Sequence, residues 1–502
     1  MVSVCKIFQL SEQFFQAHRR LLFILLYAAA NAMPALASFI LVLIYTAALP
    51  VSEFGRLNVL TATVAFLAIF IELGMPSAIL REYCDRYRDA KAMQYLANAI
   101  SGYRWVSALV LPLLVAVVFW LWPLPVQALW RTMAMISVLV LIAYFERLAE
   151  TYGSVARAIE APSHLLIGRT VTAISTIVAA ILLVAILHAG VFGALMSRMT
   201  GAVAANVVYR LRMARRENIK GGRFCWDQMR TVLKIGLPLM PNRFAMWTQQ
   251  QGLKPVLAQF VPLKGIAHYS LAASIAFMPL MATSIIDMAL SPVYFKRRVD
   301  AGVQFEERIR RLATVMMAGV FLVFAALIMF TPEIVVGIGG AKYAPAVPAC
   351  AFLFCAAYIR ALSPFLNRQI LYSRKTWLLP MVTVPSAAVA IVTAAVACRW
   401  LGFMAGAFAI VLSEVVMIFG LAMVIRRIER LQLPMVRLVF FVAALLGLAT
   451  ISGSVLLYEN VVLVASAKAG IVAAVGAAVY LIWLRPNQAF IRELMKGGPA
   501  AR

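Results

Sequence analysis

The chain has 502 residues, of which 64% are hydrophobic and 13% are charged, and its mean hydropathy is +0.90. A soluble protein of this length does not need so much apolar surface, so the composition excludes a soluble fold and indicates a polytopic membrane protein. The apolar runs are about 20 residues long, which indicates transmembrane helices and excludes a membrane β-barrel with short alternating strands.

The net charge of +26 would suggest nucleic-acid binding in a soluble protein, but here the positions of the basic residues decide. Most of the 46 lysines and arginines follow every second apolar run. Examples are Arg81 and Arg86, Arg210 and Arg212, Lys296 and Arg297, and Arg426 and Arg427. This asymmetry is the positive-inside rule, which predicts that both termini are cytoplasmic and that no nucleic acid is bound.

We therefore predict an all-α polytopic fold with about fourteen membrane-spanning helices. The expected spans are approximately 21–48, 57–80, 105–122, 132–150, 165–188, 190–209, 235–258, 267–294, 312–331, 346–367, 377–398, 402–425, 437–457 and 461–484. The connections on the predicted outer side are very short, so we expect no soluble domain there.

An internal repeat predicts two lobes. At a constant spacing, Arg19, Asn31, Leu60, Ala65 and Phe66 match Arg230, Asn242, Leu271, Ala276 and Phe277. Six predicted spans separate the copies, so both run in the same direction across the membrane, with a site expected between two six-helix lobes. The expected parts are an N-lobe (1–212), a basic cytoplasmic linker (213–232), a C-lobe (233–428), and a final helix pair with a cytoplasmic tail (429–502). The linker is expected to lie on the anionic leaflet, with a partner-binding site as the alternative.

The seventh predicted span, 235–258, contains a charged residue inside an apolar run. Arg243 lies about 13 Å beyond Lys234, in a hydrocarbon core about 30 Å thick. A charge at that depth costs at least about 2.5–3.5 kcal/mol, so it indicates a functional site.

A polar stripe surrounds this arginine on a helical wheel. It consists of Arg243, Trp247, Gln250 and Lys254, with Asn242 beside it. The first span presents a similar stripe that includes Tyr27 and Asn31. Lipid disfavours such faces, so two matched stripes favour a water-filled cleft between the lobes. The alternative is interhelical hydrogen bonding that only holds the bundle together.

Two more arginines, Arg198 and Arg360, lie within predicted spans. Three buried guanidinium groups suit an anionic substrate, particularly a phosphate or diphosphate. The spans also contain Glu72, Asp287 and Glu414. These acids either form structural ion pairs with the arginines, or exchange protons or bind a cation that drives transport.

Enzyme signatures are missing from the sequence. No Walker A motif is present, because Gly339–Lys342 lacks the required spacing and the following Ser or Thr. The four histidines and six cysteines have no metal-ligating spacing. We expect a protein that is not an enzyme and has no cofactor and no metal.

Several short segments follow one another in a recognisable order along nearly the whole chain. They are Glu53–Leu60, Gly236–Pro241, His268–Ala272, Ala289–Pro292, Tyr343–Ala346 and Leu401–Ala407. Together they resemble the Wzx-type polysaccharide transporters, which belong to the superfamily that also includes multidrug/cation antiporters and the lipid II flippase. The resemblance implies two six-helix lobes with a final helix pair, a basic central cavity and alternating access.

The resemblance also implies an activity. Such a protein moves an undecaprenyl-diphosphate-linked oligosaccharide from the cytoplasmic to the periplasmic leaflet of the bacterial inner membrane, for exopolysaccharide, capsule or O-antigen synthesis. Its partners would be the lipid-linked oligosaccharide, the phospholipid bilayer, and a polymerase with other polysaccharide-assembly proteins. Arg243, aided by Arg198 or Arg360, would hold the diphosphate. The residues that would meet the sugars are Tyr27, Asn31, Trp247 and Gln250.

One departure from the family concerns coupling to ions. Many members carry an Asp followed by a basic residue late in the seventh helix, where this chain has Gln251–Lys254. Asp287, Glu72 or Glu414 would have to take over that role. Two alternatives to a flippase stay open, namely a multidrug/cation antiporter of the same fold and a polytopic membrane glycosyltransferase.

Overall fold

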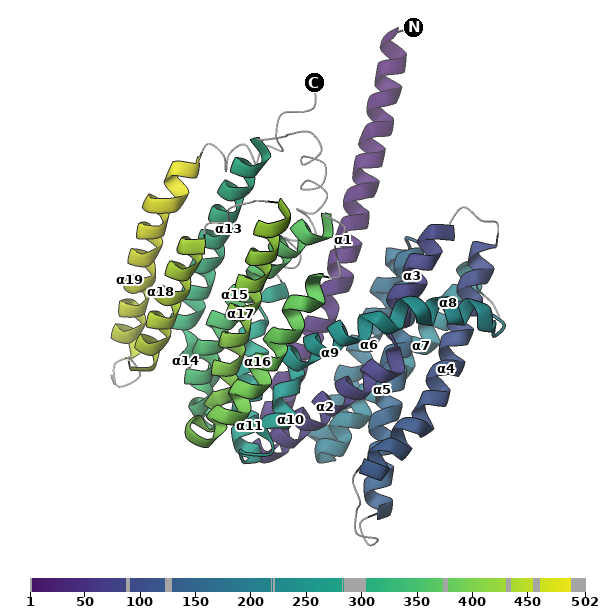
Figure 1. Cartoon of the computed structure of the whole chain (residues 1–502), viewed down its shortest axis with the longest axis horizontal. Helices are drawn as coiled ribbons and strands as arrows, with labels where there is room; N and C mark the ends of the chain where they lie inside the picture. The colour runs from purple at the N-terminus through teal and green to yellow at the C-terminus, as the bar shows by residue number, and fades with distance from the viewer. Residues whose placement is uncertain are drawn as a thin grey trace. The chain divides into compact units, whose positions relative to one another are not determined.

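The computed structural model describes residues 2–86, 91–121, 129–217, 219, 222–281, 283, 304–372, 378–429, 435–454 and 461–488 (Figure 1). Every regular element in these ranges is helical, which confirms the predicted all-α fold. By internal packing the chain divides into two units, which we describe separately. Unit 1 comprises Met1–Leu49 and Leu60–Phe244, and unit 2 comprises Pro50–Val59 and Ala245–Arg502. The predicted lobe boundaries stay a prediction.

Unit 1 contains most helices of the first half of the chain. They are α1 (Val2–Ala48), α2 (Val51–Glu72), whose first residues belong to unit 2, α3 (Met75–Arg86), α4 (Ala92–Leu121), α5 (Leu129–Ala158), α6 (Pro162–Ala180) with the π-helical η2 (Ile181–Ile186), α7 (Gly190–Arg216), α8 (Trp226–Gly236), the 3₁₀ turn η3 (Leu237–Leu239) and the start of α9 (Met240–Trp247). Buried Tyr103, Leu165 and Tyr209 lie in its core.

A sharp break divides the predicted second span, 57–80, into α2 and α3. Leu73 and Gly74 both have positive φ angles, 48° and 67°. A Cβ atom on Gly74 would lie 2.3 Å from the carbonyl oxygen of Gly236, so only glycine fits at this crossing. The break places Glu72 at the carboxyl end of α2, where its side chain can turn into unit 1.

Unit 2 contains the remaining helices. They are the end of α9, the π-helical η4 (Thr248–Gly252), α10 (Leu253–Leu257), α11 (Leu263–Phe277), α13 (Gln304–Met329), α14 (Thr331–Gly339), the 3₁₀ helix η5 (Ala341–Ala346), α15 (Val347–Tyr372), α16 (Leu378–Leu401), α17 (Met404–Glu429), α18 (Met435–Ser454), α19 (Val461–Val479), η7 (Tyr480–Leu484) and η8 (Arg485–Asn487). Helix α15 packs between α13, α17 and α18, as Figure 1 shows. Its Phe354 and Tyr358 meet Phe324 edge to face.

The seventh predicted span is not one straight helix. Pro238 and Pro241 lie in its first turns, which are the 3₁₀ turn η3 and the beginning of α9. In unit 2, the π-helical η4 follows Trp247 and changes the phase of the wheel. As a result Gln249 is buried and Gln250 is exposed.

Among the described residues, ten segments are long and apolar enough to cross a membrane. They lie on α1, α2, α6 with η2, α7, α13, η5 with α15, α16, α17, α18, and α19 with the turns after it. The chain is therefore a multi-pass membrane protein. The predicted total of about fourteen spans and the cytoplasmic location of both termini stay predictions.

Candidate functional site

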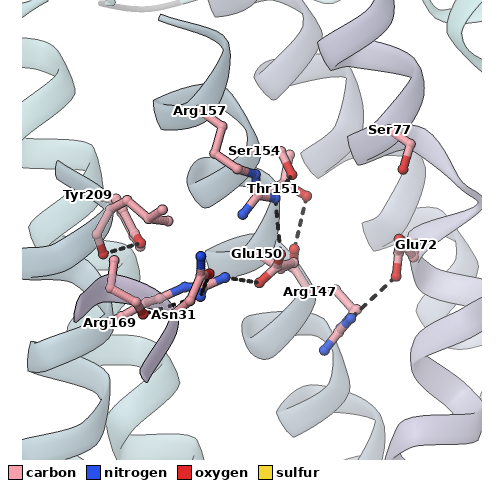
Figure 2. Close-up of polar contacts among 12 residues, drawn as sticks. Asn31, Glu72, Ser77, Arg147, Glu150, Thr151, Ser154, Arg157, Arg169 and Tyr209 are labelled. Atoms are coloured by element: carbon pink, nitrogen blue, oxygen red, sulfur yellow. Dashed lines mark hydrogen bonds and ion pairs between the residues drawn. The ribbon is translucent and has the colours of Figure 1, made fainter. Parts of the chain in front are cut away.

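One face of α5 carries the polar groups around which unit 1 is arranged. The residues on it are Glu146, Arg147, Glu150, Thr151, Ser154 and Arg157. Their spacing places them on one side of an α-helix, and Figure 2 shows Arg147 turned toward Glu72 and Glu150 turned toward Arg169. Helices α3, α4, α6 and α7 pack against α5, so this face lies inside unit 1.

Glu72 joins α5 to α9. Its carboxylate accepts a hydrogen bond from Arg147 Nη1 at 3.3 Å and forms an ion pair with Arg243 Nη2 at 3.4 Å. The same Arg243 nitrogen donates to Ser77 Oγ at 3.1 Å. The Glu72 side chain is 9% exposed, whereas that of Arg243 is 42% exposed. Arg243 is therefore only partly enclosed by its partners, whereas Glu72 is nearly buried.

Two further ion-pair groups lie along α5. Arg198 of α7 holds Glu146 with two hydrogen bonds of 3.0 Å, from Nε and Nη2. Arg169 of α6 forms an ion pair with Glu150 at 3.8 Å and donates to Asn31 Oδ1 of α1 at 2.6 Å (Figure 2). On the other side of Glu150, Arg157 Nη2 donates to Glu150 Oε1 at 3.2 Å and to Ser154 Oγ at 2.7 Å.

We call these ion-paired residues the unit 1 network. Its members are Glu72, Glu146, Arg147, Glu150, Arg157, Arg169, Arg198 and Arg243. Five arginines thus contact three glutamates, and Glu72 and Glu150 are each shared by two arginines. The network has more cationic groups than carboxylates, which suits a bound anion.

Unit 2 has a separate buried polar group. Arg360 of α15 donates from Nε to Glu414 Oε1 of α17 at 2.7 Å, and its Nη2 also contacts that oxygen. The same guanidinium reaches Gln249 Oε1 at 3.4 Å and lies over the Phe277 ring, 5.1 Å from its centroid. Gln249 Nε2 in turn donates to Ser386 Oγ of α16 at 2.7 Å. These contacts connect η4, α15, α16 and α17.

The other Glu414 oxygen is unusual. Glu414 is fully buried, and Oε2 has no hydrogen-bond partner among the described residues. An unpartnered buried carboxylate oxygen is costly, so it identifies a place that a proton or a cation could occupy.

The remaining predicted residues have different surroundings. Lys254 is buried, and its Nζ donates to Gln251 Oε1 at 2.8 Å and to Asn58 Oδ1 at 3.1 Å. Tyr27, Asn242 and Trp247 are half-buried. Asp287 lies outside the described residues. Whether these residues, or Arg198 and Arg360, contact a substrate stays a prediction.

Sequence reasoning missed most of the α5 face. Glu146, Arg147 and Glu150 fall at the end of the predicted span 132–150, and the sequence analysis does not single them out. Helix α5 continues to Ala158, so these residues lie within it. Their recurrence on one helical face was a signal that could have identified them.

The fold is that of membrane flippases and multidrug transporters. It is similar to the lipid II flippase MurJ in an inward closed conformation, with a TM-score of 0.65, 12% identity, and coverage of 94% of this chain and 100% of that one. It is also similar to the MATE transporter VcmN of Vibrio cholerae, with a TM-score of 0.58, 14% identity, and coverage of 84% and 98%. A third similar structure is a MOP superfamily transporter of Pyrococcus furiosus, with a TM-score of 0.55, 14% identity, and coverage of 82% of this chain and 95% of that one. At these identities the likeness concerns the fold.

The family of the chain follows from its sequence. Residues 23–297, more than half of the chain, match the family described as "Polysaccharide biosynthesis protein", so the chain belongs to that family. This confirms the resemblance to polysaccharide transporters. No curated protein matches the sequence. Among the described residues, no cluster of His, Cys, Asp and Glu could hold a metal ion.

Proposed function

We propose that this protein flips an undecaprenyl-diphosphate-linked oligosaccharide from the cytoplasmic to the periplasmic leaflet of the bacterial inner membrane. The product would feed exopolysaccharide, capsule or O-antigen synthesis, with a polymerase and other assembly proteins acting next. Membership of a polysaccharide biosynthesis family and a fold like that of a lipid flippase support this proposal.

The observation that carries the proposal is the sharing of Glu72 by two arginines. Arg147 and Arg243 together bring two positive charges to one carboxylate. Arg147 Nε is buried and has no hydrogen-bond partner among the described residues, and Arg243 is 42% exposed. A diphosphate supplies more negative charge and more acceptor oxygens than a carboxylate does, so it can occupy donors that Glu72 leaves free.

Other residues take supporting roles in this proposal. Tyr27, Asn31, Trp247 and Gln250 are proposed to meet sugars. We propose that Arg198 and Arg360 act from within their ion pairs by keeping the helices in register. The residue best suited to coupling transport to a proton or a cation is Glu414, because its Oε2 is buried and has no partner among the described residues.

The test is a strain whose chromosomal copy is replaced by Arg243→Ala. Each lost charge-assisted hydrogen bond costs about 1.5–3 kcal/mol, so binding of the diphosphate should weaken roughly 10- to 100-fold. We expect surface polysaccharide to disappear and undecaprenyl-linked units to accumulate, as shown by mass analysis of a lipid extract. Arg243→Lys should restore part of the activity, since lysine keeps the charge but not the forked geometry.

The matched control is Arg104→Ala, an exposed arginine of α4 outside the unit 1 network. It should leave polymer output unchanged. Normal polymer from a stably expressed Arg243→Ala protein would contradict the proposal. A deletion strain that becomes drug-sensitive while keeping its polysaccharide would favour a multidrug antiporter. Sugar transfer by the purified protein from a lipid-linked donor would favour a glycosyltransferase.

A further inference from the structure

Helix α8 lies across the flank of unit 1 with two different faces. Met229, Val232 and Gly236 are buried, and α8 packs against α3 and α4 (Figure 1). Two hydrogen bonds fix its position on α4. Gln228 Nε2 donates to the Tyr95 carbonyl oxygen at 2.7 Å, and the Arg223 amide donates to Asn98 Oδ1 at 2.9 Å.

The opposite face of α8 is basic and aromatic. Trp226, Arg230 and Lys234 follow one another at intervals of four residues, so they form one exposed stripe. Arg223 and Phe224, just before the helix, are also exposed, and Phe224 packs beside Trp226 with ring centroids 6.3 Å apart. We call these five residues the outer face of α8.

The neighbouring surface of α4 indicates the level at which α8 lies in the membrane. Trp105, Leu109 and Leu113 form an apolar stripe, with exposed fractions of 62%, 71% and 62%. In a multi-pass membrane protein such a stripe faces lipid. The Met229 side chain packs on Gly102, one turn before the stripe begins. With this stripe in lipid, the crossing of α8 and α4 would lie near the boundary between acyl chains and headgroups, and Trp105 would be an interfacial aromatic residue.

We propose that the outer face of α8 binds anionic phospholipid headgroups of the cytoplasmic leaflet. Arg223, Arg230 and Lys234 supply three positive charges, and within the described part of the chain no carboxylate pairs with them. Asp227 is the acidic residue exposed on the same helix. Basic residues on such a surface attract the anionic leaflet, while Trp226 and Phe224 insert at its boundary.

The binding has a consequence for the rest of unit 1. Helix α8 leads through η3 directly into α9, which carries Arg243. A lipid-bound α8 fixes the level at which α9 enters the membrane. The surface thus positions the helix of the proposed site without contacting the substrate.

The first experiment compares lipid retention by the full chain. Wild type and Arg223→Gln/Arg230→Gln/Lys234→Gln are purified from mixed phosphatidylcholine and phosphatidylglycerol, and the bound lipids are counted by native mass spectrometry. Each basic residue should contribute about fivefold to the preference for phosphatidylglycerol, equivalent to about 1 kcal/mol. The matched control, Arg56→Gln/Lys264→Gln/Arg399→Gln, removes two arginines and one lysine that are exposed on the predicted outer side and should keep the preference.

The second experiment uses Cys225, which is exposed next to Trp226. With Cys5 and Cys84 replaced by serine, a spin label on Cys225 reports its accessibility to oxygen and to a water-soluble relaxation agent in nanodiscs. We expect the label to be protected from the water-soluble agent, and this protection should increase when phosphatidylglycerol is added. The triple variant should lose the protection. Equal retention by wild type and the triple variant, or a fully water-exposed label in both lipids, would overturn the proposal. Normal gel filtration of the triple variant shows that it is folded.

Discussion

The pair formed by Arg360 and Glu414 allows a sharp test of what holds unit 2 together. Replacing Arg360 with Met removes the described partner of a fully buried carboxylate. Replacing Glu414 with Gln instead leaves a guanidinium that is 17% exposed and still lies over the Phe277 ring. The two single substitutions therefore differ in how completely the remaining charge is buried.

The expected magnitudes follow from that difference. Leaving a buried charge unpaired costs about 3–5 kcal/mol, and Arg360→Met should approach that cost because Glu414 has no access to solvent. Glu414→Gln should cost less, since Arg360 keeps its contact with Gln249 and its stacking on an aromatic ring. The double variant Arg360→Met/Glu414→Gln contains no unpaired charge. It should recover part of the loss, with a coupling energy of about 0.5–3 kcal/mol.

The assay is thermal inactivation of the full chain in detergent, followed by fluorescence-detected size exclusion. The apparent Tm should be highest for wild type and should decrease in the order double variant, Glu414→Gln and Arg360→Met. Arg399→Met, at an exposed position of α16, serves as the control and should match wild type. The reasoning fails if Arg360→Met is as stable as wild type, or if the double variant is no more stable than Arg360→Met.

Two further substitutions test packing directly. Gly74→Ala should prevent stable expression, because φ is +67° there and the Cβ would lie 2.3 Å from the Gly236 carbonyl oxygen. Gly447→Ala should express normally, because a Cβ added there would meet no described atom of another helix within 4 Å. Glu333→Gln should lower the apparent Tm more than Lys468→Met does. Lys468 is 1% exposed and Glu333 is 47% exposed, so only the first change leaves a charge buried without its partner. Equal losses from the two changes would contradict this reading.

The sequence predicted the class of fold well because hydrophobicity is a local property. Runs of about 20 apolar residues can satisfy their backbone polar groups in lipid only as helices, whatever surrounds them. The helices α13, α15, α16 and α17 accordingly lie where the spans 312–331, 346–367, 377–398 and 402–425 were expected. Boundaries were less accurate, as in α5, because a charged residue can end a span or lie inside a protein.

The breaks in the helices could not be predicted because they depend on distant neighbours. Gly74 is compatible with a continuous helix until the backbone of Gly236 is placed against it. Likewise, η4 adds a residue to one turn and brings Gln249 to Ser386 and Arg360, whereas a regular wheel favours Gln250. Only tertiary packing decides between these registers.

The same limit applies to Arg243, for which the sequence left two alternatives, an anionic substrate or a structural carboxylate. The ion pair with Glu72 does not by itself decide between them, because Arg147 shares that carboxylate. Glu72→Gln separates the two roles. It removes one negative charge and leaves both guanidinium groups in place, so a purified protein that uses them for a diphosphate should retain its lipid-linked substrate, with up to about tenfold tighter binding. Arg243→Ala should lose that binding. If Glu72→Gln is folded and loses as much binding as Arg243→Ala, the arginine acts through its ion pair and not on the substrate.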